Sequence, residues 1–293
     1  MTNHRQPTNP NRLCALAGTS AGKGFNDNDF TANINITGIF EVVDGKNITW
    51  REYDGTNGAF YNDAQFFSWV NKTRLSNVVP VENFFQDAYL GLLPQFSYIN
   101  PSCCALNTNS MHPTGNVSFG QLFIKQIYEA LRNGPQWENS LLVVTYDETG
   151  KFVHEAPSPR VLICWHEANI SAVGGFHDHI PPPLAVRPDN LTYTEKAHDG
   201  SNYTFAFDRL GGRLPTWVIS PYTPQGYLEN FGTDPVTGKP YPYSATSILK
   251  TLGYLWDLKD LTPRVSHSPS FDHLIGPTLR NTATLLTTPH TFA

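Results

Sequence analysis

The sequence predicts an α/β fold, in which helices pack on a mostly parallel β-sheet to form a sandwich. Two observations support this prediction. Segments with helical periodicity alternate with short apolar runs typical of buried parallel strands. Long stretches rich in Pro, Gly and Asn connect them, and such loops often carry functional sites. The 293 residues are 40% hydrophobic, enough for a sizeable core in one or two domains.

The elements are predicted in chain order from periodicity and from the residues that begin and end them. The first is a short strand at 11–18, which runs into a glycine-rich turn. The apolar run at 140–148 is hydrophobic on both faces, which suits a buried parallel strand. The remaining predicted elements are helices at 80–92, 118–134 and 244–258 and a strand at 214–222.

The helix at 118–134 has the clearest pattern. Ser118 is expected to cap its start and Gly134 to end it. Ser244 is expected to cap the last helix in the same way. The apolar face of the 118–134 helix is predicted from i, i+3 and i+4 spacing to consist of Phe119, Leu122, Phe123, Ile127 and Leu131.

Charge and hydropathy exclude several classes of partner. The net charge is −5, and the 20 Lys and Arg residues are scattered, so neither nucleic acid nor an anionic membrane surface is an expected partner. No stretch approaches the roughly 18 apolar residues that a transmembrane helix requires. The four cysteines fit no zinc motif. The sequence leaves the oligomeric state open.

Glycosylation sequons point to a secreted glycoprotein. Seven Asn-x-Ser/Thr sequons in a chain of low charge favour secretion, although unused sequons in a cytosolic protein are the alternative. The N-terminal sequence "MTNHRQPTNPNR" lacks the apolar segment of a signal peptide, so either the protein is cytosolic or its start is missing. The sequons begin at Asn35, Asn47, Asn71, Asn116, Asn169, Asn190 and Asn202.

Two adjacent acids follow the predicted strand at 140–148. Ligands in open α/β sheets bind beyond the carboxyl ends of strands, where Asp147 and Glu148 are expected to lie. Because the two carboxylates repel each other, a cation should compensate them, and a divalent metal is the natural candidate. A solvated strand end without function is the alternative.

Three further segments could carry chemistry. His177-Asp178-His179 offers a general acid or a metal ligand, or else an exposed turn. Thr19 and Ser20 are candidate nucleophiles in a glycine-rich turn at 17–24 whose spacing does not match a phosphate-binding P-loop. His112 precedes Pro113 and a predicted helix, and a lone histidine is more often structural than functional.

Four ordered motifs resemble the phosphoesterase family that includes bacterial phospholipases C and certain acid phosphatases. The resemblance extends from about residue 9 to about residue 275 and indicates a fungal-type, secreted member. It implies a core similar to alkaline phosphatase, a three-layer α/β/α sandwich. The matching segments are Pro10-Asn11-Arg12 with Gly18-Thr19, His112-Pro113 with Gly115, Trp137 through Glu148 with Gly174 through Pro183, and Arg213 through Tyr222.

The resemblance implies metal-assisted hydrolysis of a phosphoester, in the manner of a phospholipase C. Thr19 matches the nucleophile, and His112 matches a histidine that binds phosphate or protonates the leaving group. Asp147 and Glu148 match carboxylates that bind a divalent metal of unspecified identity. Asp178-His179 matches the pair that closes the catalytic loop. The implied substrate is a phospholipid or a small phosphoester, and an acid phosphomonoesterase of the same family is the alternative.

Departures from the family pattern also suggest an inactive fragment as an alternative. The family pattern begins upstream with a strand and a motif like "ENRSFDH" that completes the metal site, and nothing here matches it. We therefore expect residues 1–293 to be a partial, N-terminally truncated phosphoesterase domain with a tail at 276–293. Thr149 replaces a histidine, and residues 243–247 lack another. As written, the chain is expected to hydrolyse p-nitrophenyl phosphate or phosphatidylcholine weakly or not at all.

A 24-residue segment, 150–173, interrupts the motif after Asp147-Glu148. Its deletion gives "TYDETGGFHDHIPPP", which restores the family pattern. Codons compatible with splice sites suggest a retained intron, and a tandem duplication is the rival explanation. On this interpretation Asn169 is not a true glycosylation site. The segment's four potential metal ligands are likewise discounted: His154, Glu155, His166 and Glu167.

Overall fold

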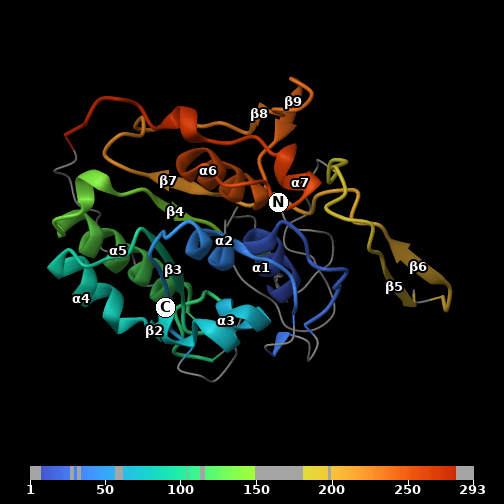
Figure 1. The fold of residues 1–293 in the computed structure, drawn as a ribbon, viewed down its shortest axis with the longest axis horizontal. Helices are drawn as coiled ribbons and strands as arrows, with labels where there is room; N and C mark the ends of the chain where they lie inside the picture. Colours follow the sequence, from blue (N-terminus) through green and yellow to red (C-terminus); the bar gives the residue numbers. More distant parts are fainter. Residues whose placement is uncertain are drawn as a thin grey trace, which may run out of the picture.

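A computed structural model shows a mixed α/β protein (Figure 1). Its helices surround a small parallel sheet, and a hairpin projects from one end of the molecule. None of the described helices is long and apolar enough to span a bilayer. The structure describes residues 8–26, 30–31, 34–56, 62–103, 105–112, 116–148, 181–196 and 199–281.

The central sheet has three parallel strands in the order β2-β1-β3. These are β2 (Val78–Pro80), β1 (Trp50–Asp54) and β3 (Phe96–Asn100). The parallel pairing confirms the predicted α/β class. The three strands themselves were missed, because they are only three to five residues long and β1 carries charged residues instead of an apolar run.

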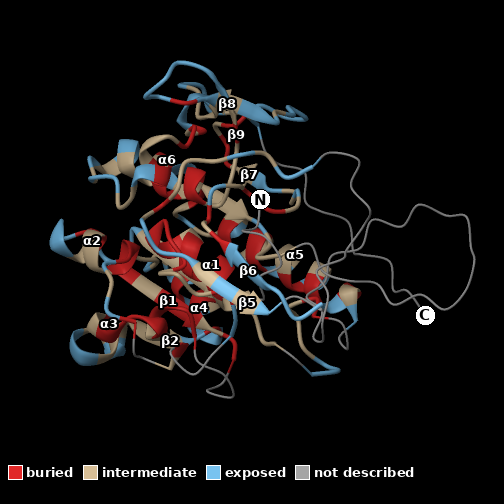
Figure 2. Ribbon diagram, turned by 90° about the vertical axis from the view of Figure 1, so that its right-hand side faces the viewer, coloured by how far each residue is buried: buried red, intermediate tan, exposed pale blue. Residues whose placement is uncertain are grey.

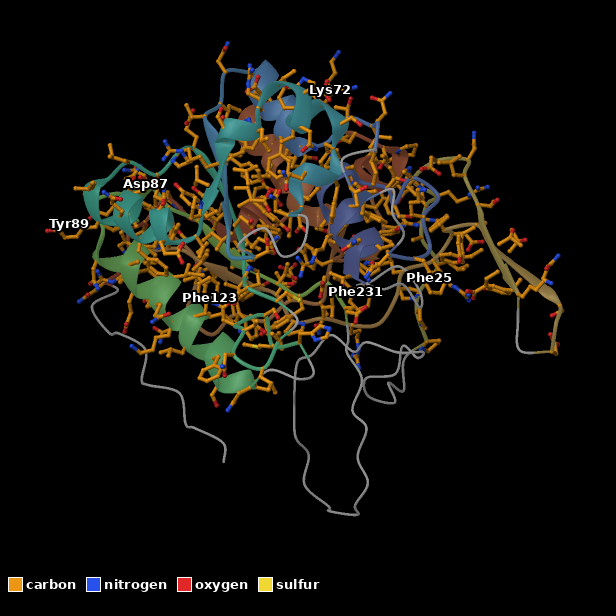
Figure 3. All side chains as sticks on the ribbon, turned by 90° about the horizontal axis from the view of Figure 1, so that it is seen from below. Phe25, Lys72, Asp87, Tyr89, Phe123 and Phe231 are labelled. Atoms are coloured by element: carbon orange, nitrogen blue, oxygen red, sulfur yellow. The ribbon has the colours of Figure 1, made fainter. Side chains whose placement is uncertain are left out.

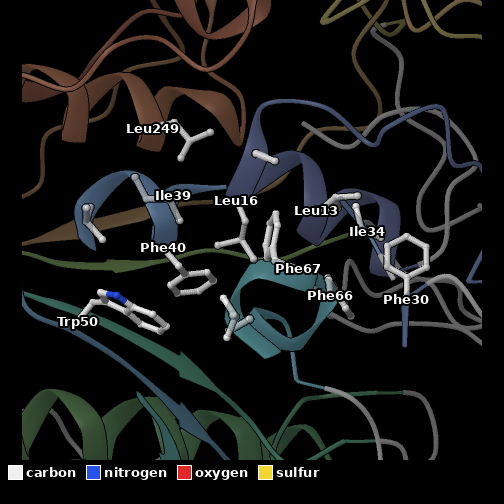
Figure 4. Close-up of a cluster of buried hydrophobic side chains, with 14 of the residues drawn as sticks. Leu13, Leu16, Phe30, Ile34, Ile39, Phe40, Trp50, Phe66, Phe67 and Leu249 are labelled. Atoms are coloured by element: carbon white, nitrogen blue, oxygen red, sulfur yellow. The ribbon is translucent and has the colours of Figure 1, made fainter. Parts of the chain in front are cut away.

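One face of the sheet is covered by α1 (Thr8–Ala17), α2 (Ile39–Gly45) and α3 (Ser68–Thr73). Aromatic rings dominate this core, and the ring of Phe40 lies 4.8 Å from that of Trp50 (Figure 4). Aromatic rings at such separations add to the stability gained from burying their area.

The other face is covered by α4 (Glu82–Leu90) and α5 (Val117–Asn133). Phe84 packs against Tyr53 of β1, with ring centroids 5.5 Å apart. Tyr89, on the outer side of α4, is 81% exposed and points away from the molecule (Figure 3). Buried segments accordingly gather in α1, β1 and α4, whereas the projecting hairpin is mostly exposed (Figure 2).

The predicted strand at 11–18 is wrong, because these residues belong to the helix α1. Leu13, Cys14, Leu16 and Ala17 are buried, which is the i, i+1, i+3, i+4 spacing of one helix face. The segment "NRLCALAG" contains no β-branched residue, and Leu, Arg and Ala rank among the strongest helix formers.

The helix α5 confirms the predicted range to within one residue at each end, but its cap differs. The side chain of Asn116 caps the helix by accepting a hydrogen bond from the backbone N–H of Ser118. The predicted apolar face is partly wrong, because Phe119 and Leu122 are 42% and 39% exposed. The buried face consists of Ser118, Gly120, Phe123, Ile127, Tyr128 and Leu131.

The run at 140–148 contributes the strand β4 (Leu142–Val144), which is half-buried and pairs with β7 (Trp217–Ile219). The pairing is antiparallel, so the prediction of a buried parallel strand is wrong for this described pair. The predicted last helix is confirmed as α6 (Thr246–Trp256), but Ala245, not Ser244, occupies its N-cap position.

The remaining described elements are short. They are the helix α7 (Pro263–Ser266), the hairpin of β5 (Tyr193–Lys196) and β6 (Asn202–Phe205), the pair of β8 (Phe231–Thr233) and β9 (Pro240–Pro242), and the 3-10 helices η2 (Ala64–Phe66), η3 (Leu75–Asn77), η4 (Trp137–Asn139) and η5 (Asp272–Leu274).

The strands β3 and β4 run in the same direction on either side of a cavity of about 720 Å³. Before both strands, the Gln136 side chain exchanges hydrogen bonds of 3.0 and 3.1 Å with the Leu93 backbone. Beyond both strands, Arg12 donates to Asn100 and Asp147. The consecutive residues 95–101 and 139–147 line the cavity, so it meets the edges of these strands.

Candidate active site

Thr19 lies in a tight turn, residues 18–23, that follows α1 and is called the Thr19 turn below. Gly18 ends the helix in the left-handed region, with φ +77°, and its N–H donates to the carbonyl of Cys14 at 2.9 Å. Lys23 N–H then donates to the carbonyl of Ser20 at 2.9 Å. The two central residues, Ala21 and Gly22, have φ of +53° and +73°, which makes this a type I′ turn.

The turn orients the hydroxyl of Thr19. Its Oγ1 accepts the backbone N–H of Ala21 at 2.9 Å and donates to a carboxylate oxygen of Asp189. The Thr19 side chain is buried but still 8% exposed. Ser20 is 1% exposed, and its hydroxyl forms no hydrogen bond with any described residue. Thr19 is therefore the better placed of the two candidate nucleophiles.

The helix α7 fixes this turn in the fold. Thr262, which caps α7, donates from its hydroxyl to the carbonyl of Gly18 at 3.1 Å. Arg264 is fully buried and donates from Nε to the carbonyl of Val186 at 2.9 Å. The same helix therefore holds both the Thr19 turn and the segment that brings Asp189 to it.

A second group of candidate residues surrounds Arg12, on α1. Its guanidinium donates to Asp147 and to Asn100 at 2.9 Å each, and contacts Asp63 at 3.4 Å. These four residues, called the Arg12 cluster below, come from α1, the ends of β3 and β4, and the residue before η2. Arg12 thus compensates the charge of Asp147, a role that the sequence analysis gave to a metal.

One further acid, Glu52, lies against Asp63 of the Arg12 cluster. Glu52 is completely buried and accepts backbone N–H groups of Asp63 and Ala64 at 3.0 and 2.8 Å. Burial and the neighbouring charge of Asp63 raise the pKa of Glu52 well above its usual range. Burial also raises the pKa of Asp63, although Arg12 and a 2.6 Å hydrogen bond from Tyr98 oppose the shift.

His112 lies close enough to the Arg12 cluster to interact electrostatically with it. The side chain is 9% exposed, and burial lowers its pKa below 6.5. The charge of Asp147 opposes this shift, while that of Arg12 adds to it. His112 is therefore mainly neutral at pH 7 and becomes an acid only at lower pH.

The structure does not bring all the predicted site residues together in one network of contacts. Within the part of the chain that the structure describes, the hydroxyl of Thr19 bonds to Ala21 and Asp189 and not to the Arg12 cluster. Arg12 lies seven residues before Thr19, which corresponds to roughly 10 Å along a helix axis. Asp178, His179 and the segment 150–173 lie outside the described residues.

The described residues do not complete a metal site. Asp147 and Glu148 offer hard oxygen ligands, but no three His, Cys, Asp or Glu residues in the described part of the chain are grouped so as to hold a metal ion. Asp147 is already paired with Arg12. A bound cation would therefore need further ligands from other residues.

Four of these residues were missed as site residues by the sequence analysis. Arg12 was noted only as part of a motif, and Asp63, Asn100 and Asp189 were not noted at all. Asn100 ends a strand that was itself missed. Asp189 follows Pro188 in a loop and has no periodic pattern around it that would mark it.

Comparison with known proteins identifies relatives of this chain. The Phosphoesterase family model matches residues 3–164 and 161–259. Non-specific phospholipase C3 of Arabidopsis thaliana is 30% identical over 293 residues, which cover 96% of this chain and 49% of the relative. Non-specific phospholipase C1 of the same plant is 29% identical over 277 residues, covering 90% and 45%.

An acid phosphatase of Aspergillus fumigatus is 28% identical over 169 residues, covering 50% of this chain and 36% of the relative. The chain spans about half the length of the plant relatives that it matches. Because the family model covers most of the chain, and the phospholipase C3 match covers nearly all of it, the chain belongs to the Phosphoesterase family.

Proposed function

We propose that this protein cleaves phosphoester bonds by transferring the phosphoryl group to Thr19. The observation that carries the proposal is the Thr19 hydroxyl, which a type I′ turn and two hydrogen bonds hold in one orientation. Family membership supports the reaction class, since the relatives are named as phospholipases C and acid phosphatases. Water would then release the product from the covalent intermediate, as the phosphorylated headgroup of a phospholipid or as phosphate from a monoester.

The Arg12 cluster and His112 would serve the phosphoryl group. Arg12 holds Asp147 at the end of β4, and His112 offers a ring nitrogen to a phosphoryl oxygen or a leaving group. With ligands from other residues, Asp147 and Glu148 would hold a divalent cation that neutralises charge on the phosphoryl oxygens. Asp178 and His179 remain proposed members of this site.

The proposed substrate is a phospholipid, because the plant relatives that match most of the chain are named as phospholipases C. An acid phosphomonoesterase is the second candidate, supported by the acid phosphatase that matches half of the chain. Turnover should be slow, since Thr149 replaces a histidine of the family pattern and residues 243–247 lack another.

We further propose that β2-β1-β3 and β4-β7 belong to one sheet of a three-layer, alkaline-phosphatase-like domain. Helices lie on both faces of β1, and β3 and β4 run in the same direction on either side of the cavity. A cavity between the edges of two strands is where one more strand would fit, because its backbone would pair with the unpaired groups of both edges. This supports a partial domain at 1–293, whereas the tail at 276–293 stays a prediction, because residues 282–293 lie outside the described residues.

The segment 150–173 is proposed as an insert. The two parts of the family match end and begin within it, at residues 164 and 161. The genomic sequence tests this proposal: a retained intron requires a splice donor at codons 150–151. Mature transcripts that always contain the segment would contradict the intron origin.

Secretion is also proposed. Five of the six sequons that the structure describes have exposed asparagines. The exception, Asn71, donates its amide to two carbonyls at 2.8 and 3.0 Å and is not expected to carry a glycan. Cys103 is disulfide-bonded, which suits an oxidising compartment. The exposed sequons begin at Asn35, Asn47, Asn116, Asn190 and Asn202.

The test is hydrolysis of phosphatidylcholine and p-nitrophenyl phosphate by the 293-residue chain, with and without added divalent cations. Slow release that Thr19→Ala abolishes and Ser20→Ala preserves would support the proposal. Equal release by Thr19→Ala and the unsubstituted chain would refute the nucleophile. Release from p-nitrophenyl phosphate but not from the lipid would favour the phosphomonoesterase.

A further inference from the structure

The segment 189–193 packs on the Thr19 turn through alternate residues. Asp189 accepts the hydroxyl of Thr19, and Leu191 lies against Gly22, where an added methyl group would come within 3.2 Å of it. Tyr193 lies so close to Gly24 that an added methyl group would be only 2.5 Å from its ring. These three alternate residues therefore contact one stretch of the chain, residues 19–24, and hold the two segments together.

The hydrogen bonds of Thr19 leave one part of its hydroxyl unused. A threonine hydroxyl has one proton to donate and two lone pairs that can accept. The proton is directed at Asp189, and one lone pair accepts the N–H of Ala21 at 2.9 Å. The second lone pair is free to attack phosphorus, and the proton already points at a group that could receive it.

Resting on the proposed function, we propose that Asp189 is a catalytic residue, the general base that takes the proton of Thr19. The carboxylate contacts the reacting oxygen directly, which is the arrangement of a nucleophile activated by an adjacent base. Its other oxygen accepts the backbone N–H of Leu191 at 2.8 Å, so the carboxylate is fixed on both sides.

The step balances with these groups alone. The free lone pair of Thr19 Oγ1 forms the bond to phosphorus, and the bond from phosphorus to the leaving oxygen breaks, with its electron pair going to that oxygen. The proton of Thr19 moves to Asp189 Oδ2. With p-nitrophenyl phosphate the leaving group departs as the phenolate anion and needs no proton. When water later displaces Thr19 from phosphorus, Asp189 returns the proton to Oγ1.

The competing explanation is that Asp189 only clamps the turn. The bond to Leu191 and the packing of Tyr193 on Gly24 would hold the segment without any role in catalysis. The test must therefore measure chemistry at Thr19 separately from stability.

The experiment measures the rate at which Thr19 becomes phosphorylated by p-nitrophenyl phosphate, in the full 293-residue chain, by acid quench and mass spectrometry. The variants are Asp189→Asn and Asp189→Ala. The matched control is Asp199→Asn, because Asp199 also accepts the N–H two residues on, at 2.9 Å, but does not contact Thr19. Thermal unfolding of each variant reports any structural damage.

We expect Asp189→Asn to slow phosphorylation about 100-fold or more, with an unfolding midpoint close to that of the unsubstituted chain. Asp199→Asn should label within about twofold of the unsubstituted rate. Formate should partly restore labelling of Asp189→Ala, because it can enter the space that the carboxylate leaves and accept the proton. It should not restore Asp189→Asn, where the amide fills that space.

Labelling of Asp189→Asn at the unsubstituted rate would overturn the inference and leave Thr19 as the nucleophile. So would a loss of labelling that parallels a loss of stability and does not respond to formate, since that is the behaviour of a clamp. If the unsubstituted chain itself forms no phosphothreonine at residue 19, the proposed function fails, and the role of Asp189 fails with it.

Discussion

The Thr19 turn and the Arg12 cluster place candidate groups by different physical means. The turn uses backbone geometry, with three left-handed residues, Gly18, Ala21 and Gly22, and hydrogen bonds from the residues around them. The Arg12 cluster instead uses charge, through one guanidinium that bonds two carboxylates and an amide from three separate parts of the chain.

This difference predicts different responses to substitution. Removing the Arg12 guanidinium leaves the carboxylates of Asp63 and Asp147 without their positive partner in a poorly solvated site, so the fold should lose stability. Removing the Thr19 hydroxyl leaves one oxygen of the Asp189 carboxylate and the backbone N–H of Ala21 without this partner, but it deletes no charge. The fold should hardly change, whereas phosphoryl transfer should stop.

Arg12→Ala should reduce the free energy of unfolding by about 3 kcal/mol, because it leaves Asp63 and Asp147 without their shared cation. Arg12→Lys should rescue only part of this loss, since an ammonium cannot reproduce the guanidinium contacts. Urea unfolding measures both. Lys46→Ala, which removes a surface ion pair with the exposed Asp257, is the control and should change little. An Arg12→Ala variant as stable as that control would contradict the idea that the Arg12 cluster is held together by charge.

His112→Gln should slow cleavage of glycerol phosphate about 100-fold at acid pH, if His112 protonates the leaving oxygen. Burial lowers the pKa of His112, so the protonated form is lost as pH rises through a value below 6.5. The unsubstituted rate should fall over that range, and the variant should show no such fall. p-Nitrophenyl phosphate is the control, since its phenolate leaves without a proton. An equal loss with both substrates would instead indicate phosphate binding.

Much of the fold class, but little of this site chemistry, could be predicted from sequence. The helices α4, α5 and α6 were predicted correctly because their sequence patterns are local, although the predicted caps of α5 and α6 were wrong. The strand β1 was not predicted, because it is stabilised by burial between two helical layers and has no apolar run of its own.

The candidate site shows the same division between local and distant information. Thr19, His112, Asp147 and Glu148 were predicted from motifs, each of which is contiguous in sequence. The partners of these residues were missed, because Asp189 meets Thr19 across 170 positions of sequence and Arg12 meets Asp147 across 135. No rule based on residue spacing along the chain can predict a contact between residues so far apart in sequence. Only the folded chain, through α7 and the strand ends, brings these residues together.

Glu52→Gln should flatten the pH dependence of stability. Burial raises the pKa of Glu52 above 4.5 in the folded state, so the native state binds its proton more tightly than the unfolded state does. The stability contributed by Glu52 is therefore fully present below pH 4.5 and is lost as pH rises through its folded pKa. Urea unfolding from pH 4 to pH 8 should show this decline in the unsubstituted chain and a smaller one in the variant. Parallel curves would contradict the assignment.

Ala21→Gly should stabilise the fold slightly, by less than about 1 kcal/mol. Ala21 has φ of +53°, which costs an L-residue roughly 1 kcal/mol, and glycine removes that strain but adds backbone entropy to the unfolded chain. Gly45→Ala is a useful comparison, because Gly45 ends α2 with open space around it. A clear loss of stability in Ala21→Gly would show that the turn does not have the geometry described.

The central claim is that Thr19 accepts the phosphoryl group. The most direct measurement is peptide mapping by mass spectrometry of the 293-residue chain, quenched in acid after incubation with p-nitrophenyl phosphate. We expect one phosphoryl group on Thr19, absent from Thr19→Ala and present in Ser20→Ala. Phosphate on Ser20, or no covalent phosphate while p-nitrophenol is still released, would contradict it.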